Sequence, residues 1–181
     1  MELYFITGNK NKFAEASAII SGLKQLDIDL DEIQETDAKK VIEHKLQEAL
    51  THKKAHFIVE DSSLYFDCLG KLPGVLIKWF WKELGNNGLY DLCRRYNNFE
   101  AEAVVTLGYT DGNKIKYFEG RMSGKIVKPV AKEGFGYDPI FAPEGHNKTY
   151  HEMINEEKNK ISHRRKVLDK LKKYLTGKPL R

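Results

Sequence analysis

The sequence predicts an α/β or α+β protein with a mixed β-sheet. Patterns of strand and helix alternate through the first hundred residues, whereas residues 101–127 predict consecutive strands joined by an Asp-Gly turn. The 181 residues can bury a sizeable core, and neither the 41% hydrophobic nor the 31% charged fraction indicates disorder. We therefore expect residues 1–181 to form a single domain.

The first predicted elements are a strand, a turn and a helix. Residues 3–6 form an apolar run typical of a buried strand, and Phe13, Ala16 and Ile20 share one face of a helix. The turn between them, TGNKNK at 7–12, places backbone N–H groups and two lysines at a helix N-terminus, which favours an anion. The alternative is an ordinary solvated turn. It is not a Walker A loop, because that glycine and lysine spacing is absent.

A half-buried strand and a second helix follow. Leu26, Ile28 and Leu30 alternate with polar residues, which predicts a strand. An acidic connector then leads to a helix from about residue 37 to residue 52. Lys45 stands within the apolar stripe of this helix, where its stem packs and its charged head reaches water in the simplest interpretation.

Two adjacent carboxylates end the next predicted strand. Residues 57–59 are apolar, and Glu60 and Asp61 follow them. Successive side chains of a strand point to opposite faces, so we expect a turn after Val59 if the two carboxylates are to converge. Two close carboxylates need a positive partner, so the pair predicts either a Mg²⁺ site or an exposed acidic turn.

The middle of the chain predicts helices and then a hairpin. A glycine-proline turn at residues 70–74 precedes a helix that carries Lys78 among apolar and aromatic residues. The Asn-Asn-Gly segment at 86–88 interrupts this helix before a further one. Residues 101–109 and 115–119 then predict an antiparallel hairpin around Asp-Gly, with 122–127 extending the same sheet.

Two later clusters predict binding elements. The segment GFGYDPIF at 134–141 forms a tight loop that suits a planar base stacked on Phe135 or Tyr137, or else a turn that fills the core. Ser162 is a predicted helix N-cap. Lys158, His163 and Arg164 then lie at or before a helix start, where the dipole opposes cations and an anion is favoured.

Charge and cysteine content limit the class of protein. Residues 158–181 contain ten Lys/Arg and one Asp, a charge of +9, so residues 1–157 carry −5 of the net +4. Such a basic segment suits nucleic acid, a phosphorylated small molecule or a solvated helix face. Two cysteines without metal-type spacing suit a reducing compartment. We expect no secretory signal and no membrane span, and a cytoplasmic location.

Six segments, taken together, resemble a known family, the inosine triphosphate pyrophosphatases. They occur in the family's order and at its approximate spacing over nearly the whole chain. The segments are TGNKNK (7–12), VEDS (59–62), LPGV (72–75), GRMSGKI (120–126), FGYDPIF (135–141), and EKN (157–159) with SHR (162–164).

The resemblance implies an α/β fold with an elongated mixed sheet flanked by helices in two lobes, and a nucleotide in a central cleft. It also implies a Mg²⁺-dependent hydrolase that cuts the α–β phosphate bond of ITP, dITP and XTP, giving the monophosphate and pyrophosphate. The expected partners are the nucleotide and a second copy of the chain in a homodimer, with no stable nucleic acid and no membrane.

The resemblance also assigns site residues by position. Asp61 would be the catalytic carboxylate, and Glu32, Glu60 and Asp61 would hold the metal, with Glu35 close enough in register to replace Glu32. The substrate would be bound by Thr7, Gly8, Asn9, Lys10, Asn11, Lys12, Lys45, Ser62, Lys78, Phe135, Gly136, Tyr137, Asp138, Lys158, Ser162, His163 and Arg164. Of these, residues 7–12 and the two helical lysines would hold phosphates, and residues 135–138 would bind the base. The base and sugar side would be completed by Lys158, Ser162, His163 and Arg164.

Two alternatives stay open. One is a related pyrophosphatase that acts on modified pyrimidine nucleotides. The other is a nucleic-acid-binding module that uses the basic C-terminal segment. The Glu60-Asp61 pair disfavours the second alternative, because a binding module needs no such carboxylates.

Overall fold

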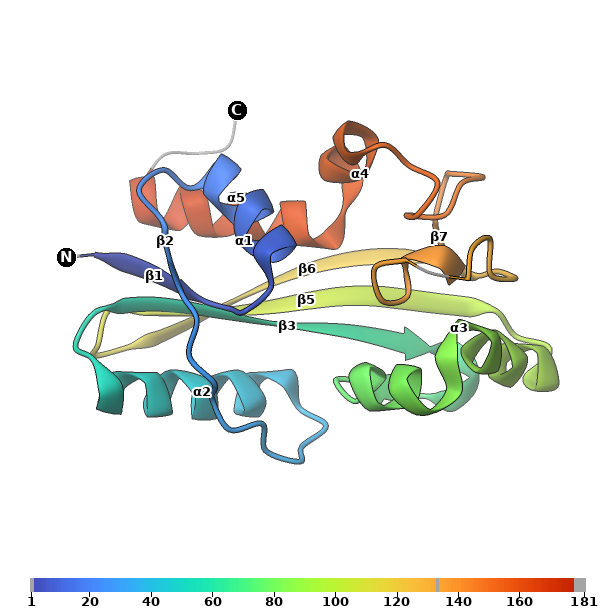
Figure 1. The fold of residues 1–181 in the computed structure, drawn as a ribbon, viewed down its shortest axis with the longest axis horizontal. Coiled ribbons are helices and arrows are strands. Elements are labelled where there is room, and N and C mark those ends of the chain that lie inside the picture. The colour runs from blue at the N-terminus through green and yellow to red at the C-terminus, as the bar shows by residue number, and fades with distance from the viewer. Residues whose placement is uncertain (1, 133, 178–181) are drawn as a thin grey trace. The chain divides into compact units, whose positions relative to one another are not determined.

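The computed structural model of the chain describes residues 2–132 and 134–177, and these residues form seven strands and five α-helices (Figure 1). The strands are β1 (Leu3–Ile6), β2 (Lys24–Leu26), β3 (His56–Phe66), β4 (Pro73–Gly74), β5 (Glu100–Thr110), β6 (Ile115–Ile126) and β7 (Phe141–Pro143). The helices are α1 (Lys10–Ile19), α2 (Ala38–His52), α3 (Ile77–Tyr96), α4 (Asn155–Ile161) and α5 (His163–Thr176), with short 3-10 helices η1 (Asp67–Leu69) and η2 (Asp138–Ile140).

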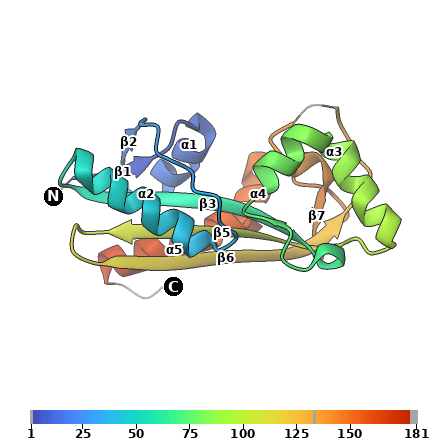
Figure 2. The same cartoon turned by 90° about the horizontal axis from the view of Figure 1, so that it is seen from below.

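The strands form one mixed sheet, which confirms the α/β prediction. Their order is β2-β1-β3-β5-β6-β7, and β4 pairs with β3. β1 runs parallel to both β2 and β3, whereas β3–β4 and β6–β7 are antiparallel pairs. The three long strands β3, β5 and β6 lie side by side in both views (Figure 1 and Figure 2).

Most predicted elements are confirmed, but their ends differ in places. Asp37 caps α2 by accepting a hydrogen bond from the Lys39 amide at 2.9 Å, and Ser162 directly precedes α5. β2 ends at Leu26, so the prediction that Ile28 and Leu30 continue the strand was wrong. Their side chains are instead half-buried against the core beneath α2, which explains the alternating pattern without strand pairing.

The turn expected after Val59 is absent. β3 runs without interruption from His56 to Phe66, so Glu60 and Asp61 stand within a strand. Leu64 and Phe66 at its far end are fully buried, and the strand continues because these apolar side chains pack into a core. The two carboxylates therefore point to opposite faces of the sheet.

The chain divides into two compact units, each assembled from separate segments. The first contains the described residues up to Asp61, residues 105–120 and the described residues from Arg164 onward. The second contains residues 62–104 and 121–163. β3, β5 and β6 contribute residues to both units. The expectation of one domain stays a prediction.

In the first unit, helices cover both faces of the strands (Figure 1). α1 and α5 cover one face, where Phe5 and Ile58 belong to their core. α2 covers the other, where Phe57 and Val59 pack with Ile42. The alternation of Phe57, Ile58 and Val59 between the two cores follows from the pleat of β3.

In the second unit, one core gathers side chains from strands, helices and loops. Its fully or almost fully buried members include Leu64, Phe66, Leu89, Cys93, Phe141 and Tyr150. α3 contributes Leu89 and Cys93, and Ile161 of α4 packs against the same cluster. Within the described residues, no helix is both long and apolar enough to span a membrane.

A close approach of α2 to β5 makes Gly108 a sensitive position. A Cβ at Gly108 would lie 2.2 Å from Cγ2 of Ile42 and 2.9 Å from Cδ1 of Leu46. We expect Gly108→Ala to lower the free energy of unfolding by about 1–3 kcal/mol through overpacking, and Ile42→Ala to lower it by about 2–5 kcal/mol. The double variant should lose less than the sum, because the clashing methyl is gone. Urea denaturation measures all three, and strict additivity would contradict this packing.

Candidate functional site

The turn between β1 and α1 is built by its own side chains. Asn9 Oδ1 accepts hydrogen bonds from the amides of Asn11 and Lys12, at 3.0 and 3.1 Å, and Thr7 Oγ1 accepts one from the Asn9 amide at 3.1 Å. Gln25 of β2 donates to the Thr7 carbonyl at 2.8 Å. The predicted strand-to-helix turn is therefore confirmed. Because Asn9 occupies the amides of Asn11 and Lys12, the attraction for an anion rests largely on the lysine side chains.

Glu60 is the centre of a buried charge cluster in the first unit. Its side chain is 1% exposed and lies 3.2 Å from Lys12 Nζ. Arg164 Nε donates to both Glu60 oxygens, at 3.1 and 3.3 Å, and Arg164 Nη1 lies 3.1 Å from Glu15 Oε2. The cluster thus joins α1, β3 and α5 through two carboxylates and two cations.

This cluster keeps the Glu60 carboxyl ionised. Burial by itself would raise the pKa of Glu60, but the charges and hydrogen bonds of Arg164 and Lys12 outweigh it and hold the pKa below its usual value. A buried carboxylate is stable only when it is paired in this way. Glu60 is therefore a fixed negative charge that orients the two cations.

Asp61 belongs to the other face of the sheet. Since Glu60 turns toward α1 and α5, the pleat of β3 directs Asp61 to the face on which Phe57 and Val59 pack against α2. On α2, Lys45 Nζ lies 2.9 Å from Glu32 Oε1. Lys45, a predicted phosphate-binding residue, thus pairs with Glu32, a predicted metal ligand. Lys45 belongs to α2 and Glu32 to the connector before it, on the same face of the sheet as Asp61.

Glu35 has a local role in the connector before α2. One of its oxygens accepts hydrogen bonds from the amides of Thr36 and Asp37, at 2.7 and 3.2 Å, and the other lies 3.0 Å from Lys40 Nζ. These partners, Lys40 first and the two amides next, lower the pKa of Glu35 to about 2. A side chain engaged in this turn is a poorer candidate for a metal ligand than Glu32.

The loop at residues 135–138 forms a closed turn in the second unit. The Asp138 amide donates to the Phe135 carbonyl at 3.0 Å, and Gly136 has φ +56°, a conformation that favours glycine. Lys158 of α4 forms an ion pair with Asp138, and its ammonium lies 5.6 Å from the Phe135 ring centroid. Phe135 is 39% exposed, which leaves part of the residue accessible for stacking.

His163 is held between two tyrosines. The Tyr137 hydroxyl lies 3.1 Å from His163 Nε2, and the Tyr150 hydroxyl lies 3.5 Å from His163 Nδ1. Both rings stack on the imidazole, with interplanar angles of 27° and 26°. The histidine is 4% exposed. Its orientation is therefore fixed by the second unit's own core and loop.

The predicted site residues fall into two groups, one in each unit. The first unit holds Thr7, Gly8, Asn9, Lys10, Asn11, Lys12, Glu32, Lys45, Glu60, Asp61 and Arg164. The second holds Ser62, Lys78, Phe135, Gly136, Tyr137, Asp138, Lys158, Ser162 and His163. Arg164, predicted on the base side, contacts Glu60 and Glu15 and so lies with the phosphate-side residues. Lys78 is exposed at the start of α3, with its ammonium 5.5 Å from the Trp79 ring.

The sequence did not predict two residues that contact the predicted site residues, Glu15 and Tyr150. Glu15 stands three residues after Lys12 on α1, a spacing that brings side chains together on a helix and would have indicated their proximity. Tyr150 gave no such signal, since its contact with His163 exists only through the packing of the second core.

The chemistry of the carboxylates bears on metal binding. In the described ranges 2–132 and 134–177, no three His, Cys, Asp or Glu side chains are grouped as a metal site. Mg²⁺ commonly takes one or two carboxylates and completes its shell with water and substrate phosphates. As oxygen donors, the carboxylates of Glu32 and Asp61 fit such an ion. Glu32 has one lysine partner, Lys45, whereas buried Glu60 is paired with two cations.

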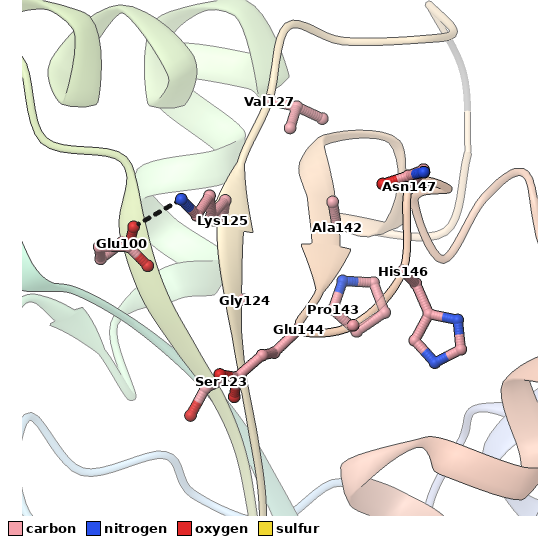
Figure 3. A pocket seen from close by; sticks show the side chains of 11 residues that line it. Glu100, Ser123, Gly124, Lys125, Val127, Ala142, Pro143, Glu144, His146 and Asn147 are labelled. Carbon is pink, nitrogen blue, oxygen red and sulfur yellow. Dashed lines mark ion pairs between the residues drawn. The ribbon is translucent and has the colours of Figure 1, made fainter.

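A separate groove of about 640 Å³ lies in the second unit (Figure 3). It is bordered by β6, β7 and the loop after β7, and the ion pair between Lys125 and Glu100 spans 3.0 Å at one side. Its lining residues are Glu100, Ser123, Gly124, Lys125, Val127, Ala142, Pro143, Glu144, Gly145, His146 and Asn147. None of them is a predicted site residue, so this groove is distinct from the site.

Known proteins match the chain over nearly its full length. The model of the Ham1 family matches residues 3–174. A protein of Fusarium vanettenii named inosine triphosphate pyrophosphatase is 43% identical, with 94% of both chains covered. One of the same name from Schizosaccharomyces pombe is 39% identical, covering 96% of this chain and 94% of its own.

Solved structures match as well. A HAM1 protein from Coxiella burnetii covers 98% of this chain and 100% of its own with a TM-score of 0.84, and at 24% identity it supports the fold alone. The structure titled nucleoside-triphosphatase / dITP/XTP pyrophosphatase from Mycobacterium abscessus is 29% identical, with a TM-score of 0.73 and 94% and 98% of the two chains covered.

The Glu60 cluster should make stability depend on pH. Glu60→Gln removes the buried counter-charge that Lys12 and Arg164 share and leaves Arg164 with Glu15 alone, so we expect a loss of about 3–5 kcal/mol of unfolding free energy at pH 7. The folded-state pKa of Glu60 is lowered, so its contribution is complete above the unfolded pKa of about 4.3 and disappears as the pH falls through the folded pKa. The difference between wild type and variant should therefore shrink in acid.

Chemical denaturation between pH 7 and pH 3 measures this difference. Glu100→Gln is the matched control, because Glu100 pairs with Lys125 on the surface with both side chains more than half exposed, at 54% and 65%. That variant should change stability by less than about 1 kcal/mol at any pH. A Glu60→Gln effect as small as the control's would show that the cluster does not stabilise the fold.

Proposed function

Since the chain belongs to the Ham1 family, we propose that it hydrolyses ITP, dITP and XTP at the α–β phosphate bond, releasing the nucleoside monophosphate and pyrophosphate. Relatives of about 40% identity carry the name inosine triphosphate pyrophosphatase. By this activity the protein would remove non-standard purines from the nucleotide pool. The observation that carries the proposal is that Glu60 and Asp61, adjacent in β3, face opposite sides of the sheet. Glu60 is bound by cations on one face, and Asp61 belongs to the face of Glu32 and Lys45.

Hydrolysis of a polyphosphate needs positioning and charge neutralisation more than covalent catalysis. Lys12 is held near β3 by Glu60, and Lys45 is held on α2 by Glu32. Both ammonium groups are partly buried, so a phosphate oxygen would meet cations whose positions are already fixed. Lys10 and Lys78 are more exposed and would add charge at the ends of the triphosphate.

Asp61 is the proposed general base. A carboxylate accepts the proton of the water that attacks phosphorus, while pyrophosphate leaves with the electron pair of the broken P–O bond. Glu32 and Asp61 would hold Mg²⁺ together with phosphate oxygens. When bound, Mg²⁺ supplies neutralisation of phosphate charge and a lower pKa for its water.

The base-side residues would recognise the purine. Phe135 offers an exposed ring for stacking, and Asp138, oriented by Lys158, would accept from a ring N–H. The 6-oxo group of hypoxanthine or xanthine accepts hydrogen bonds, so His163 would donate to it. An amino group at that position presents a second donor, and two facing donors leave buried polar groups unpaired.

The alternative of nucleic-acid binding has less support. Arg164 pairs with Glu60, Arg165 Nε lies 2.8 Å from Asp169 Oδ2, and Lys170 donates to the Glu119 carbonyl at 2.6 Å. Several cations of α5 thus have partners within the protein.

The family resemblance also leads us to propose that the protein forms a homodimer and is located in the cytoplasm.

The proposal is tested by the products of hydrolysis. Purified protein with Mg²⁺ should release pyrophosphate and IMP from ITP at a much higher kcat/KM than the corresponding reaction of ATP or GTP. Asp61→Asn should lower kcat by at least about 100-fold, because the general base is lost, while nucleotide binding persists. Release of orthophosphate from ITP, or near-wild-type turnover by Asp61→Asn, would contradict the mechanism. Preference for a modified pyrimidine triphosphate would favour the alternative substrate class.

A second experiment distinguishes Glu32 from Glu35. Glu32→Gln should raise the Mg²⁺ concentration needed for half-maximal activity by at least about tenfold, since it removes a proposed ligand. Glu35→Gln should leave that concentration unchanged, because Glu35 is engaged in the turn before α2. Titrating Mg²⁺ at saturating ITP measures both, and a shift in the Glu35 variant alone would reverse the assignment.

A further inference from the structure

α3 is broken where a loop of the second unit meets it. Its backbone departs from helical geometry at Gly85, with φ +62° and ψ −179°. This conformation is easily reached by glycine only. The chain resumes the helix at Asn86, one residue after the break. α3 also contacts η2, which begins at the end of the loop at residues 135–138.

The Asn86 side chain bonds to the centre of that loop. Asn86 Nδ2 donates to the Gly136 carbonyl at 3.2 Å. Gly136 is the positive-φ residue of the turn closed by the Asp138 amide and the Phe135 carbonyl. The Gly136 carbonyl does not take part in the hydrogen bond that closes the turn. It accepts a hydrogen bond from the side-chain amide of Asn86 instead.

The orientation of the Asn86 amide is fixed by this bond. Reversing the amide would set Oδ1 against the Gly136 carbonyl, two acceptors without a proton between them. Oδ1 is instead buried and has no hydrogen-bond partner among the described residues, a condition shared there only with Nδ1 of His44. A buried unpaired acceptor destabilises a fold, so asparagine at this position is poorly explained by stability.

We propose that Asn86 is a positioning residue that holds the loop at 135–138 in the conformation that receives the base. The role of the loop rests on the proposed function, whereas its attachment to α3 does not. Lys78 lies in the first turn of the same helix, before the break at Gly85. α3 therefore carries one proposed phosphate-binding residue and the anchor of the proposed base loop.

Hydrogen–deuterium exchange followed by mass spectrometry tests the attachment. In Asn86→Ala, amides at 135–138 should exchange about fivefold faster, as expected for the loss of one neutral hydrogen bond, while other peptides are unchanged. The melting temperature should change little, because the variant also removes the unpaired Oδ1. Asn86→Asp keeps the shape without the donor and should speed exchange similarly. It also provides the measurement if the alanine variant does not fold.

Asn87→Ala is the matched control, since Asn87 is the exposed neighbour in the same helix. It should leave loop exchange and kinetics unchanged. Unchanged loop exchange in both Asn86 variants would overturn the attachment, as would equal acceleration in Asn87→Ala.

Kinetics with ITP test the role of the loop. The KM of Asn86→Ala should rise several-fold with kcat nearly unchanged, because the residues that act on the phosphates are untouched. Faster loop exchange with an unchanged KM would overturn the positioning role. If the wild type does not hydrolyse ITP, the proposed function fails, but the exchange result still decides whether Asn86 holds the loop.

Discussion

The structure of the first unit depends on one buried carboxylate. Glu60 stands in β3 with almost no exposure, and it would be unstable there without Lys12 from α1 and Arg164 from α5. Both cations are distant from Glu60 in sequence, so the cluster fixes how α1 and α5 lie on the strands. Within the cluster, Arg164 is paired with carboxylates and is not an exposed surface charge. Glu15, bound by Arg164 Nη1, is the second carboxylate of the cluster.

The same constraint separates the roles of two neighbouring acids. Because β3 continues through Glu60 and Asp61, the strand directs one carboxylate to the cation cluster and the other to the face of α2. There Lys45 and Glu32 form their own pair. We infer that Glu60 organises the site while Asp61 acts in it, a distinction that two adjacent letters in the sequence do not reveal.

In the second unit, the base-side residues are positioned by packing. The stacking of Tyr137, His163 and Tyr150, and the Lys158–Asp138 pair, orient the polar groups that would read a purine. Asn86 joins this arrangement through the Gly136 carbonyl. Asn86 directly follows Gly85, where the backbone of α3 departs from helical geometry. The sequence pattern predicted this interruption one residue later, at Asn-Asn-Gly.

By itself, the sequence determined the α/β class, the turn at 7–12, the limits of α2, the hairpin between β5 and β6, and the family through six ordered motifs. These follow from local periodicity, capping and turn chemistry, which act over a few residues. Only the tertiary structure decided that β3 has no turn at Glu60, that Arg164 lies with Lys12, that Tyr150 contacts His163, and that Asn86 bonds to the loop at 135–138. Those outcomes depend on which charges and rings meet across the fold, and burial makes such pairings decisive because an unpaired charge or acceptor is unstable there.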